Sequence, residues 1–125
     1  MILNLTDLSD EPLQSQIYRQ IRAMILANEI DAGTMLPSIR GLARDQKVSV
    51  ITVQRGYEML EREGLIISRR GKGFYVNEVD NNMKRELAEE QLTEKLKPIF
   101  SIAEDEGLTQ SDIKYIINKL LKEEN

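Results

Sequence analysis

Two helix-start signals that lie close together constrain this chain more than any other feature of its sequence. Ser38 precedes a short amphipathic stretch and Ser49 precedes a longer one, and serine is a preferred capping residue at the start of a helix. Only the turn DQKVS separates the two stretches. The longer helix is expected to end at Gly64, because glycine readily takes the left-handed conformation that closes a helix. The sequence therefore predicts two helices joined by a tight turn.

An earlier helix is predicted by apolar residues at a spacing of four. Asp10, Glu11 and Pro12 resemble a helix start, with a capping side chain, a negative charge and a proline in the first turn. The helix is expected to extend to about Asn28, and its apolar stripe consists of Leu13, Ile17, Ile21 and Ile25.

The helix after Ser49 has two different sides when each residue is given 100° of turn. Val53, Tyr57 and Leu60 fall on one side, so Tyr57 is expected in the core. Gln54 and Arg55 fall on the other side and are expected to face outward.

A basic hairpin is predicted directly after Gly64. Two strand-like runs, Leu65–Ser68 and Gly73–Val76, are linked by Arg69, Arg70, Gly71 and Lys72. The glycines near the tip allow close backbone approach to a ligand, and the cations suit an anionic one.

The C-terminal part is predicted to contain two further helices. One covers about 83–106 and has Pro98 inside it, so a kink or break is expected there. The other covers 109–123, and Thr109 with Asp112 resembles a capping box. Two helices of this length cannot form a core alone, so their apolar stripes predict a symmetric dimer. The predicted dimer contacts are Leu87, Leu96, Ile99, Phe100, Ile113, Ile116, Ile117, Leu120 and Leu121.

Composition excludes several classes of protein. The 125 residues contain no cysteine and no histidine, which removes disulfides and the commonest general base and metal ligand. No apolar run is long enough to span a membrane, and no signal peptide is recognisable. We therefore expect a cytoplasmic protein that is not an enzyme and uses no cofactor or metal; the acidic run 104–106 is expected to be a solvated helix end.

The net charge of −4 conceals a division along the chain. Residues 1–76 have ten basic and nine acidic side chains, whereas residues 77–125 have seven and twelve. Within 38–73 the balance is eight basic to four acidic. Positive charge thus gathers where the paired helices and the hairpin are predicted, which favours an anionic partner.

Paired helices followed by a basic hairpin form the pattern of a winged helix-turn-helix. In that fold the second helix of the pair lies in the major groove of DNA, where its N-terminal residues reach base edges. The expected fold class is therefore mainly α with a small β-hairpin, comprising a winged helix-turn-helix domain at 1–76 and an α-helical dimerisation tail at 77–125.

Residues 12–76 resemble the DNA-binding domain of the GntR family of bacterial transcriptional regulators. The matching features are Pro12-Leu13, Gly33 followed by Leu36-Pro37-Ser38, Thr52-Val53, the run from Leu60 to Leu65, and the glycine-bearing wing. The short tail resembles the YtrA-like subgroup. The resemblance implies a sequence-specific regulator, expected to be a repressor, that binds a palindromic double-stranded DNA operator as a homodimer.

The predicted DNA contacts combine this resemblance with the basic residues of the same elements. The resemblance places contacts on Arg40, on the start of the second paired helix, and on Arg70 with Gly71. Relatives often have arginine where Val50 and Gln54 stand, so the operator sequence cannot be transferred from them. The full predicted set is Ser38, Arg40, Arg44, Ser49, Val50, Ile51, Thr52, Gln54, Arg55, Arg69, Arg70, Gly71 and Lys72.

Two other functions compete with this interpretation. Winged helices also serve as protein-interaction modules, and the apolar Val50 and Ile51 leave room for that alternative, although the positive balance of 38–73 argues against it. An enzyme is disfavoured by the missing histidine and cysteine and by the lack of a glycine-rich phosphate loop. The sequence identifies no small-molecule effector.

Overall fold

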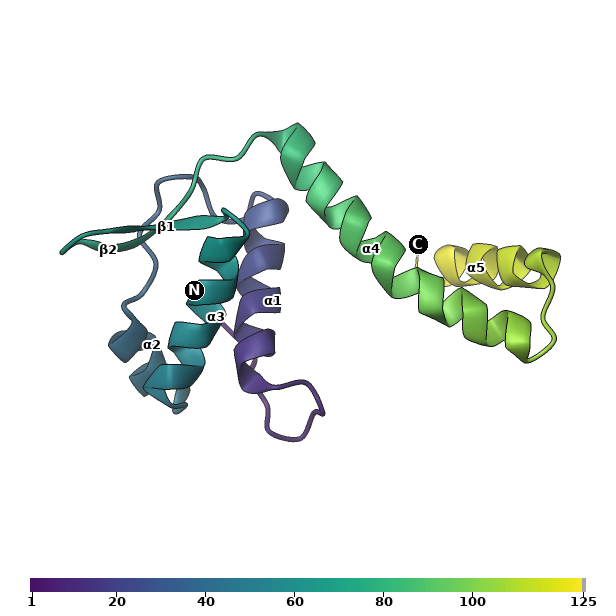
Figure 1. The fold of residues 1–125 in the computed structure, drawn as a ribbon, viewed down its shortest axis with the longest axis horizontal. Coiled ribbons are helices and arrows are strands. Elements are labelled where there is room, and N and C mark those ends of the chain that lie inside the picture. Colours follow the sequence, from purple (N-terminus) through teal and green to yellow (C-terminus); the bar gives the residue numbers. More distant parts are fainter. Residues whose placement is uncertain (125) are drawn as a thin grey trace. The chain divides into compact units, whose positions relative to one another are not determined.

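The computed structural model describes residues 1–124 and divides the chain into two compact units, Met1–Lys84 and the part from Arg85 onward. The first unit contains α1 (Leu13–Leu26), α2 (Ile39–Gln46), α3 (Val50–Arg62), β1 (Ile66–Arg69) and β2 (Gly73–Val76) (Figure 1). α4 (Asn81–Asp105) begins at the end of this unit, and α5 (Gln110–Glu124) lies in the second. The predicted class, mainly helical with one antiparallel hairpin, is confirmed.

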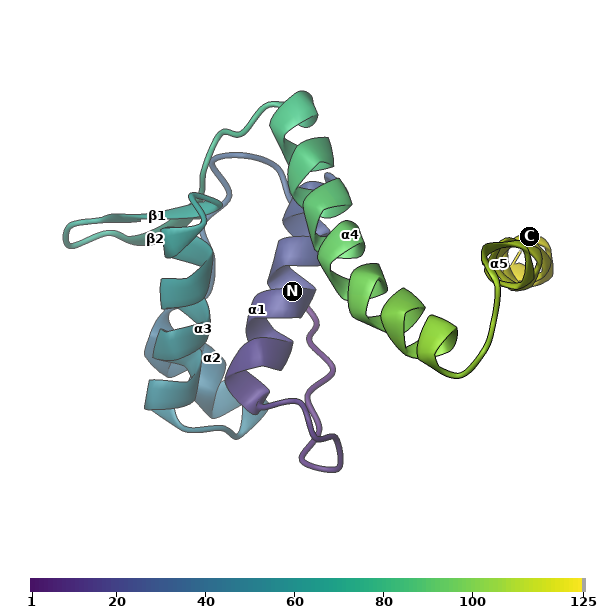
Figure 2. The same cartoon turned by 45° about the vertical axis from the view of Figure 1, so that its right-hand side comes forward.

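The core of the first unit lies between α1 and α3. In the predicted stripe of α1, Leu13 at the start of the helix is half-buried, and Ile17, Ile21 and Ile25 are fully inaccessible to solvent. They face the apolar side of α3, where Val53, Tyr57 and Leu60 are also inaccessible. Leu36, Leu42, Ala43, Leu65, Ile66 and Val76 extend this core under α2 and the hairpin. Figures 1 and 2 show α1 and α3 side by side, with the hairpin projecting from the C-terminal end of α3.

Gly56 lets α1 and α3 approach closely. A Cβ atom at this position would lie 2.9 Å from Ile17 Cγ2 and 3.2 Å from the Gln14 carbonyl oxygen. Both separations are shorter than ordinary van der Waals contact, and the second involves backbone that cannot rotate away. The glycine at 56 is therefore a requirement of packing.

α2 and α3 each begin at a serine cap, and a single left-handed residue ends α2 before the turn. The Ser38 hydroxyl accepts from Gly41 N–H (3.0 Å) and the Ser49 hydroxyl accepts from Thr52 N–H (3.1 Å), so both predicted caps are confirmed. Lys47 ends α2 in the left-handed backbone conformation (φ 57°). This conformation is energetically unfavourable for any residue that has a Cβ atom.

Gly64 ends α3 as the sequence predicts. Its φ is +80°, its N–H donates to the Glu61 carbonyl (3.0 Å), and the Leu65 N–H donates to the Leu60 carbonyl (3.0 Å). This pair of bonds is a Schellman motif, and it turns the chain directly into β1.

The hairpin has a third pairing segment that the sequence analysis missed. β1 and β2 are antiparallel, with Ile67 opposite Tyr75. On the other edge of β2, Leu36 N–H donates to the Phe74 carbonyl (2.9 Å) and Val76 N–H donates to the Thr34 carbonyl (2.9 Å). Gly33 and Pro37 are typical of a loop, so the sequence analysis did not predict a strand here. The segment pairs with residues about 40 positions later, and such a distant pairing leaves no local signal in the sequence.

Tyr57 joins three parts of the unit. Its hydroxyl donates to the Pro37 carbonyl (2.7 Å), just before α2. Its ring meets Phe74 of β2 edge-on, with 5.2 Å between the centroids. The expected core position of Tyr57 is confirmed, and the residue fixes both α2 and the hairpin to α3.

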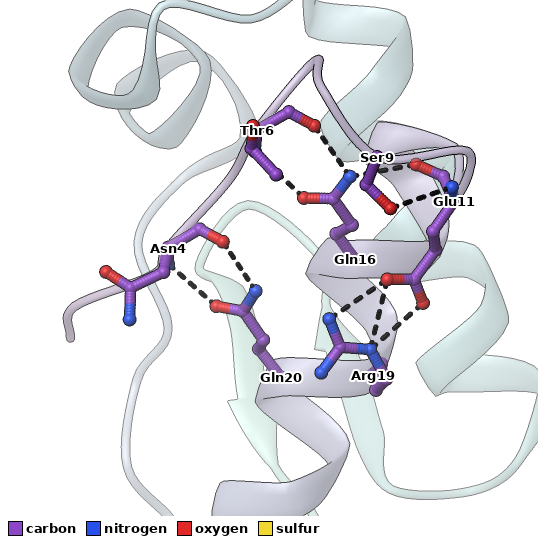
Figure 3. Close-up of polar contacts among 7 residues, drawn as sticks. All are labelled: Asn4, Thr6, Ser9, Glu11, Gln16, Arg19 and Gln20. Carbon is purple, nitrogen blue, oxygen red and sulfur yellow. Dashed lines mark hydrogen bonds and ion pairs between the residues drawn. The ribbon is translucent and has the colours of Figure 1, made fainter.

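The N-terminal segment runs along α1 as a strap (Figure 3). The Gln16 side chain accepts from Thr6 N–H (2.9 Å) and donates to the Thr6 carbonyl (2.8 Å). Gln20 makes the same pair of bonds with the backbone of Asn4, both at 2.8 Å. Four helical residues rise about 6 Å and two extended residues span about 6.6 Å, so the two clamps match in spacing.

The predicted start of α1 needs correction. α1 begins at Leu13 after Pro12, and no side chain caps it. Asp10 is not the cap, because the cap position is Pro12, two residues further along, and Pro12 has no side chain that can accept a hydrogen bond. Gln16 Nε2 instead donates to the Glu11 carbonyl (2.8 Å) at the entry to the helix.

An ion pair between a buried arginine and a half-buried glutamate links α1 to the end of α3. Arg22 Nε donates to Glu63 Oε1 (2.9 Å), and the Tyr18 hydroxyl donates to the same oxygen (2.8 Å). The arginine side chain is only 7% exposed, so water does little to screen the pair.

The second unit contains no buried side chain among the residues described from 85 to 123. Its capping box is confirmed, because Thr109 N–H donates to Asp112 Oδ2 (2.9 Å) and Asp112 N–H donates to Thr109 Oγ1 (3.1 Å). The bond from Thr109 N–H, followed by the neighbouring Thr109 hydroxyl, holds the pKa of the Asp112 carboxyl below its ordinary value.

Of the kink or break predicted at Pro98, the break is absent, since α4 continues through the proline. The proline removes one ladder bond, to the carbonyl of Glu94, and that residue is exposed, so water can replace the lost donor. None of the helices in residues 1–124 combines the length and apolar character that a bilayer crossing requires.

Replacing Gly56 with alanine should lower the free energy of unfolding of the first unit. Alanine favours the helix by about 1 kcal/mol, but overpacking costs about 1–3 kcal/mol, so we expect a net loss of up to about 2 kcal/mol, with a central value of about 1 kcal/mol. Urea titration followed by circular dichroism at fixed protein concentration measures the change. Arg55→Ala, at the exposed neighbouring position, should alter stability by less than about 0.5 kcal/mol. Equal stability of G56A and wild type would contradict the packing argument.

Alkaline pH should destabilise the protein through Tyr57. Burial raises the pKa of this phenol above its ordinary value of 10.0. The unfolded chain therefore loses the proton first, and stability that is complete below pH 10 falls as the pH rises beyond it. Tyr57→Phe should lose less unfolding free energy than wild type between about pH 8 and pH 11. Tyr115→Phe, whose ring is exposed, should follow wild type, and an equally steep decline in Y57F would disprove this origin.

Candidate nucleic-acid interface

The predicted DNA contacts come from three adjoining elements of the first unit: the start of α2, the start of α3 and the tip of the hairpin. α2 and β1 each pack directly on α3, so the three parts belong to one folded body. All thirteen predicted residues are exposed except Thr52, which is half-buried. We call these thirteen residues the reading surface: Ser38, Arg40, Arg44, Ser49, Val50, Ile51, Thr52, Gln54, Arg55, Arg69, Arg70, Gly71 and Lys72.

The start of α2 offers a cation beside a capped helix end. Ser38 is the cap, so its hydroxyl oxygen is already engaged. Arg40 follows on the exposed side of the first turn, and no ion pair involves it within residues 1–124. Arg44 has only a long contact of 3.6 Å with exposed Asp45, which a phosphate could replace at little cost.

The start of α3 combines polar caps with exposed apolar side chains. The hydroxyls of Ser49 and Thr52 lie 2.7 Å apart and share a hydrogen bond. Val50 and Ile51, 40% and 48% exposed, point away from the core. Apolar side chains here can touch a thymine methyl, while the free N–H groups of the helix start suit a phosphate.

Gln54 lies one turn further along α3, and acidic residues follow it. Its Nε2 donates to Glu58 Oε1 (3.1 Å). Glu61, on the next turn, accepts from the Ser68 hydroxyl of β1 (2.9 Å). The outward side of α3 therefore changes from basic and apolar to acidic, which confines favourable contact with phosphates to its first half.

The tip of the hairpin is a tight turn. Lys72 N–H donates to the Arg69 carbonyl (2.8 Å), and Gly71 has φ +74°. Arg70 and Lys72 stand in this turn, exposed and without an ion pair in the described chain. A Cβ at Gly71 would meet nothing within 4 Å, so the backbone at the tip is open to a ligand.

Arg69 differs from its two cationic neighbours. Its guanidinium lies over the Tyr75 ring, 4.8 Å from the centroid. The register puts both side chains on one face of the hairpin, opposite the face where Phe74 meets Tyr57. The stacked arginine is held in place more firmly than the tip residues are.

Sequence reasoning missed three residues beside the reading surface. Lys47 adds an exposed cation in the turn before α3. Tyr75 holds Arg69, and Glu58 holds Gln54. The spacing of four between Gln54 and Glu58 could have revealed the last pair, because residues four apart are neighbours on a helix.

Comparison with known proteins agrees with this geometry. Residues 13–76 match the family described as bacterial regulatory proteins, gntR family. The HTH-type transcriptional repressor YtrA of Bacillus subtilis is 36% identical over 103 residues, covering 80% of this chain and 77% of that protein. The uncharacterized HTH-type transcriptional regulator YhcF of the same organism is 32% identical, with 84% and 86% covered.

Solved structures extend the likeness beyond the matched domain. A GntR family transcriptional regulator from Listeria monocytogenes superposes with a TM-score of 0.75 at 28% identity, covering 89% of this chain and 96% of that one. YtrA from Sulfolobus acidocaldarius, a GntR-family transcription factor, gives 0.58 at 34% identity, with 74% and 99% covered. The family match, the 36% sequence identity to a protein named as a repressor and the shared fold all agree. The chain therefore belongs to the GntR family of DNA-binding transcriptional regulators.

Proposed function

We propose that this chain represses transcription in the cytoplasm by occupying a palindromic operator as a homodimer, with the reading surface of each copy on one half-site. The observation that carries the proposal is the exposure of this surface. Arg40, Arg55, Arg70 and Lys72 make no ion pair within residues 1–124, so DNA phosphates are available partners for them. The name of the Bacillus subtilis relative supports repression rather than activation.

Different residues of the reading surface would contact phosphates and base edges, according to their side-chain chemistry. The cations at the hairpin tip and at the start of α2 would neutralise phosphates and give affinity without sequence preference. The first turns of α3 would enter the major groove, where Val50, Ile51 and Gln54 meet base edges. We propose Arg69, stacked on Tyr75, as a contact on the flank of the wing.

The unburied tail supports a dimer. Among the residues described from 85 to 123 no side chain is buried, although both helices have apolar stripes. Ile99, Leu120 and Leu121 are all more than half exposed. Apolar surface on this scale is stabilised when a second copy covers it, and a two-fold pair would present two α3 helices to half-sites about 34 Å apart.

Lys72→Ala should weaken binding to every duplex by a similar factor, because the lost contact is to phosphate. The slope of log affinity against log salt should fall by about one. Fluorescence anisotropy on labelled duplexes at several salt concentrations measures both quantities. Lys122→Ala on α5, an exposed cation outside the reading surface, is the matched control and should leave the slope unchanged. A K72A slope equal to that of wild type would remove the wing tip from the interface.

Combined Ile116→Asp and Leu120→Asp should convert the protein to a monomer and lower operator affinity by about tenfold or more, since each copy then binds alone. Sedimentation velocity reports the assembly state. Asn118→Asp adds one of these negative charges at a polar exposed position of α5 and should leave the dimer intact. An unchanged dimer in the double variant would refute this interface.

A further inference from the structure

The structure points to Glu58 as a positioning residue that sets which base pair Gln54 prefers; we infer this from the bond between their side chains and rest it on the proposed reading role of α3. Gln54 Nε2 donates to Glu58 Oε1 at 3.1 Å. Both side chains are exposed on the outward side of α3, one turn apart. Neither residue contributes to the core, so the pair has no packing role to explain it.

The chemistry of the pair fixes the orientation of the amide. An ionised carboxylate only accepts hydrogen bonds, so it can face the NH2 group of Gln54 but not the carbonyl oxygen. Rotation of the amide by 180° would turn Oε1 toward the negative charge and break the bond. Val50, one turn earlier in the same row, offers no polar group that could hold the opposite orientation. The amide therefore has one preferred orientation, with Oε1 and the second N–H left for a partner.

A fixed amide distinguishes base pairs that a rotating amide would confuse. Adenine presents an acceptor and a donor side by side in the major groove, and a glutamine matches both when its own donor and acceptor are in the corresponding order. Reversal of that order loses the paired contact. By holding the order, Glu58 should favour A·T in one orientation over the reversed T·A pair.

The Glu58 carboxylate also lowers the affinity for DNA of any sequence. A negative side chain beside the groove repels phosphates, so a chain selected for tight binding alone would not place one next to its reading residue. In water the exposed bond between the two side chains is weak, but water is excluded when α3 enters the groove and the bond then orders the amide more strongly. Glu58 thus reduces affinity while it sharpens preference.

The experiment uses the full-length protein and a random duplex pool to identify the preferred site and the base pair affected by Gln54→Ala. Affinity is then measured for duplexes with each of the four base pairs at that position. Glu58→Ala should bind every duplex more tightly while its discrimination between A·T and T·A falls by about tenfold. Glu58→Gln, whose amide can either accept from Gln54 or donate to it, no longer fixes the orientation, so it should bind more tightly and lose discrimination as E58A does.

Two controls separate positioning from charge. Glu61→Ala removes the same charge one turn further along α3, where the partner is Ser68, and should leave discrimination at this base pair unchanged. In the Gln54→Ala background, Glu58→Ala should cause no further loss of discrimination, because there is no amide left to orient.

Each other outcome has a definite meaning. Unchanged discrimination in E58A, or an undiminished effect of E58A in the Gln54→Ala background, would overturn the inference and leave the proposed function standing. A changed preference at a different base pair would also overturn it, since Glu58 would then read a base itself. If the wild type selects no preferred duplex from the pool, it is the proposed function that fails.

Discussion

Tyr57 lies where every part of the reading surface is anchored. Its ring belongs to the α1–α3 core, its hydroxyl holds the backbone before α2, and its edge meets the aromatic ring of β2. α2, α3 and the wing are short elements that could not keep a fixed arrangement by themselves. A single buried phenol with one satisfied hydrogen bond gives them a common reference, and the close contact at Gly56 fixes the helix that bears it against α1.

Around that anchor, polar side chains on the reading surface are engaged to different degrees. Ser38 and Ser49 are committed to helix caps, and Gln54 to Glu58, whereas Arg40, Arg70 and Lys72 stand without such partners in the described chain. Engaged groups meet DNA in a set geometry, while long free cations adapt to the phosphates they encounter. The polar groups of α3 are therefore held in a fixed geometry, whereas the cations at the wing tip are free to adjust to DNA.

Much of the first unit could be predicted because its signals are local. The caps at Ser38 and Ser49, the closing glycine at 64 and the spacing of the α1 stripe each depend on a few neighbouring residues, and all are confirmed. The pairing of 33–36 with β2 was missed because it joins distant segments. The start of α1 was wrong because the strap, not Asp10, leads into the helix, and the break at Pro98 was wrong because an exposed helix tolerates one lost bond.

The site was predictable at the level of residue types and elements. Helical periodicity and the glycine-rich tip placed the basic residues on the outside, where the structure also has them. Periodicity alone did not reveal that Arg69 would stack on Tyr75 or that Gln54 would bond to Glu58, since both depend on side-chain rotamers. The contacts that these residues make with DNA remain predictions.

Gln16 and Gln20 of α1 hydrogen-bond to peptide groups of the N-terminal strap rather than to its side chains. The amino acid at position 4 can therefore change, provided that it does not become proline, which has no N–H to donate. At position 6 the Thr6 hydroxyl also accepts from Leu8 N–H (3.1 Å), so a substitution there loses that bond while the backbone bonds to Gln16 remain. Removing residues 1–6 would be far more disruptive, because the nearly inaccessible Gln16 amide would lose both bonds to Thr6 and keep only its bond to the Glu11 carbonyl, and Leu3 would be missing from the core. The strap therefore tolerates substitution far better than truncation.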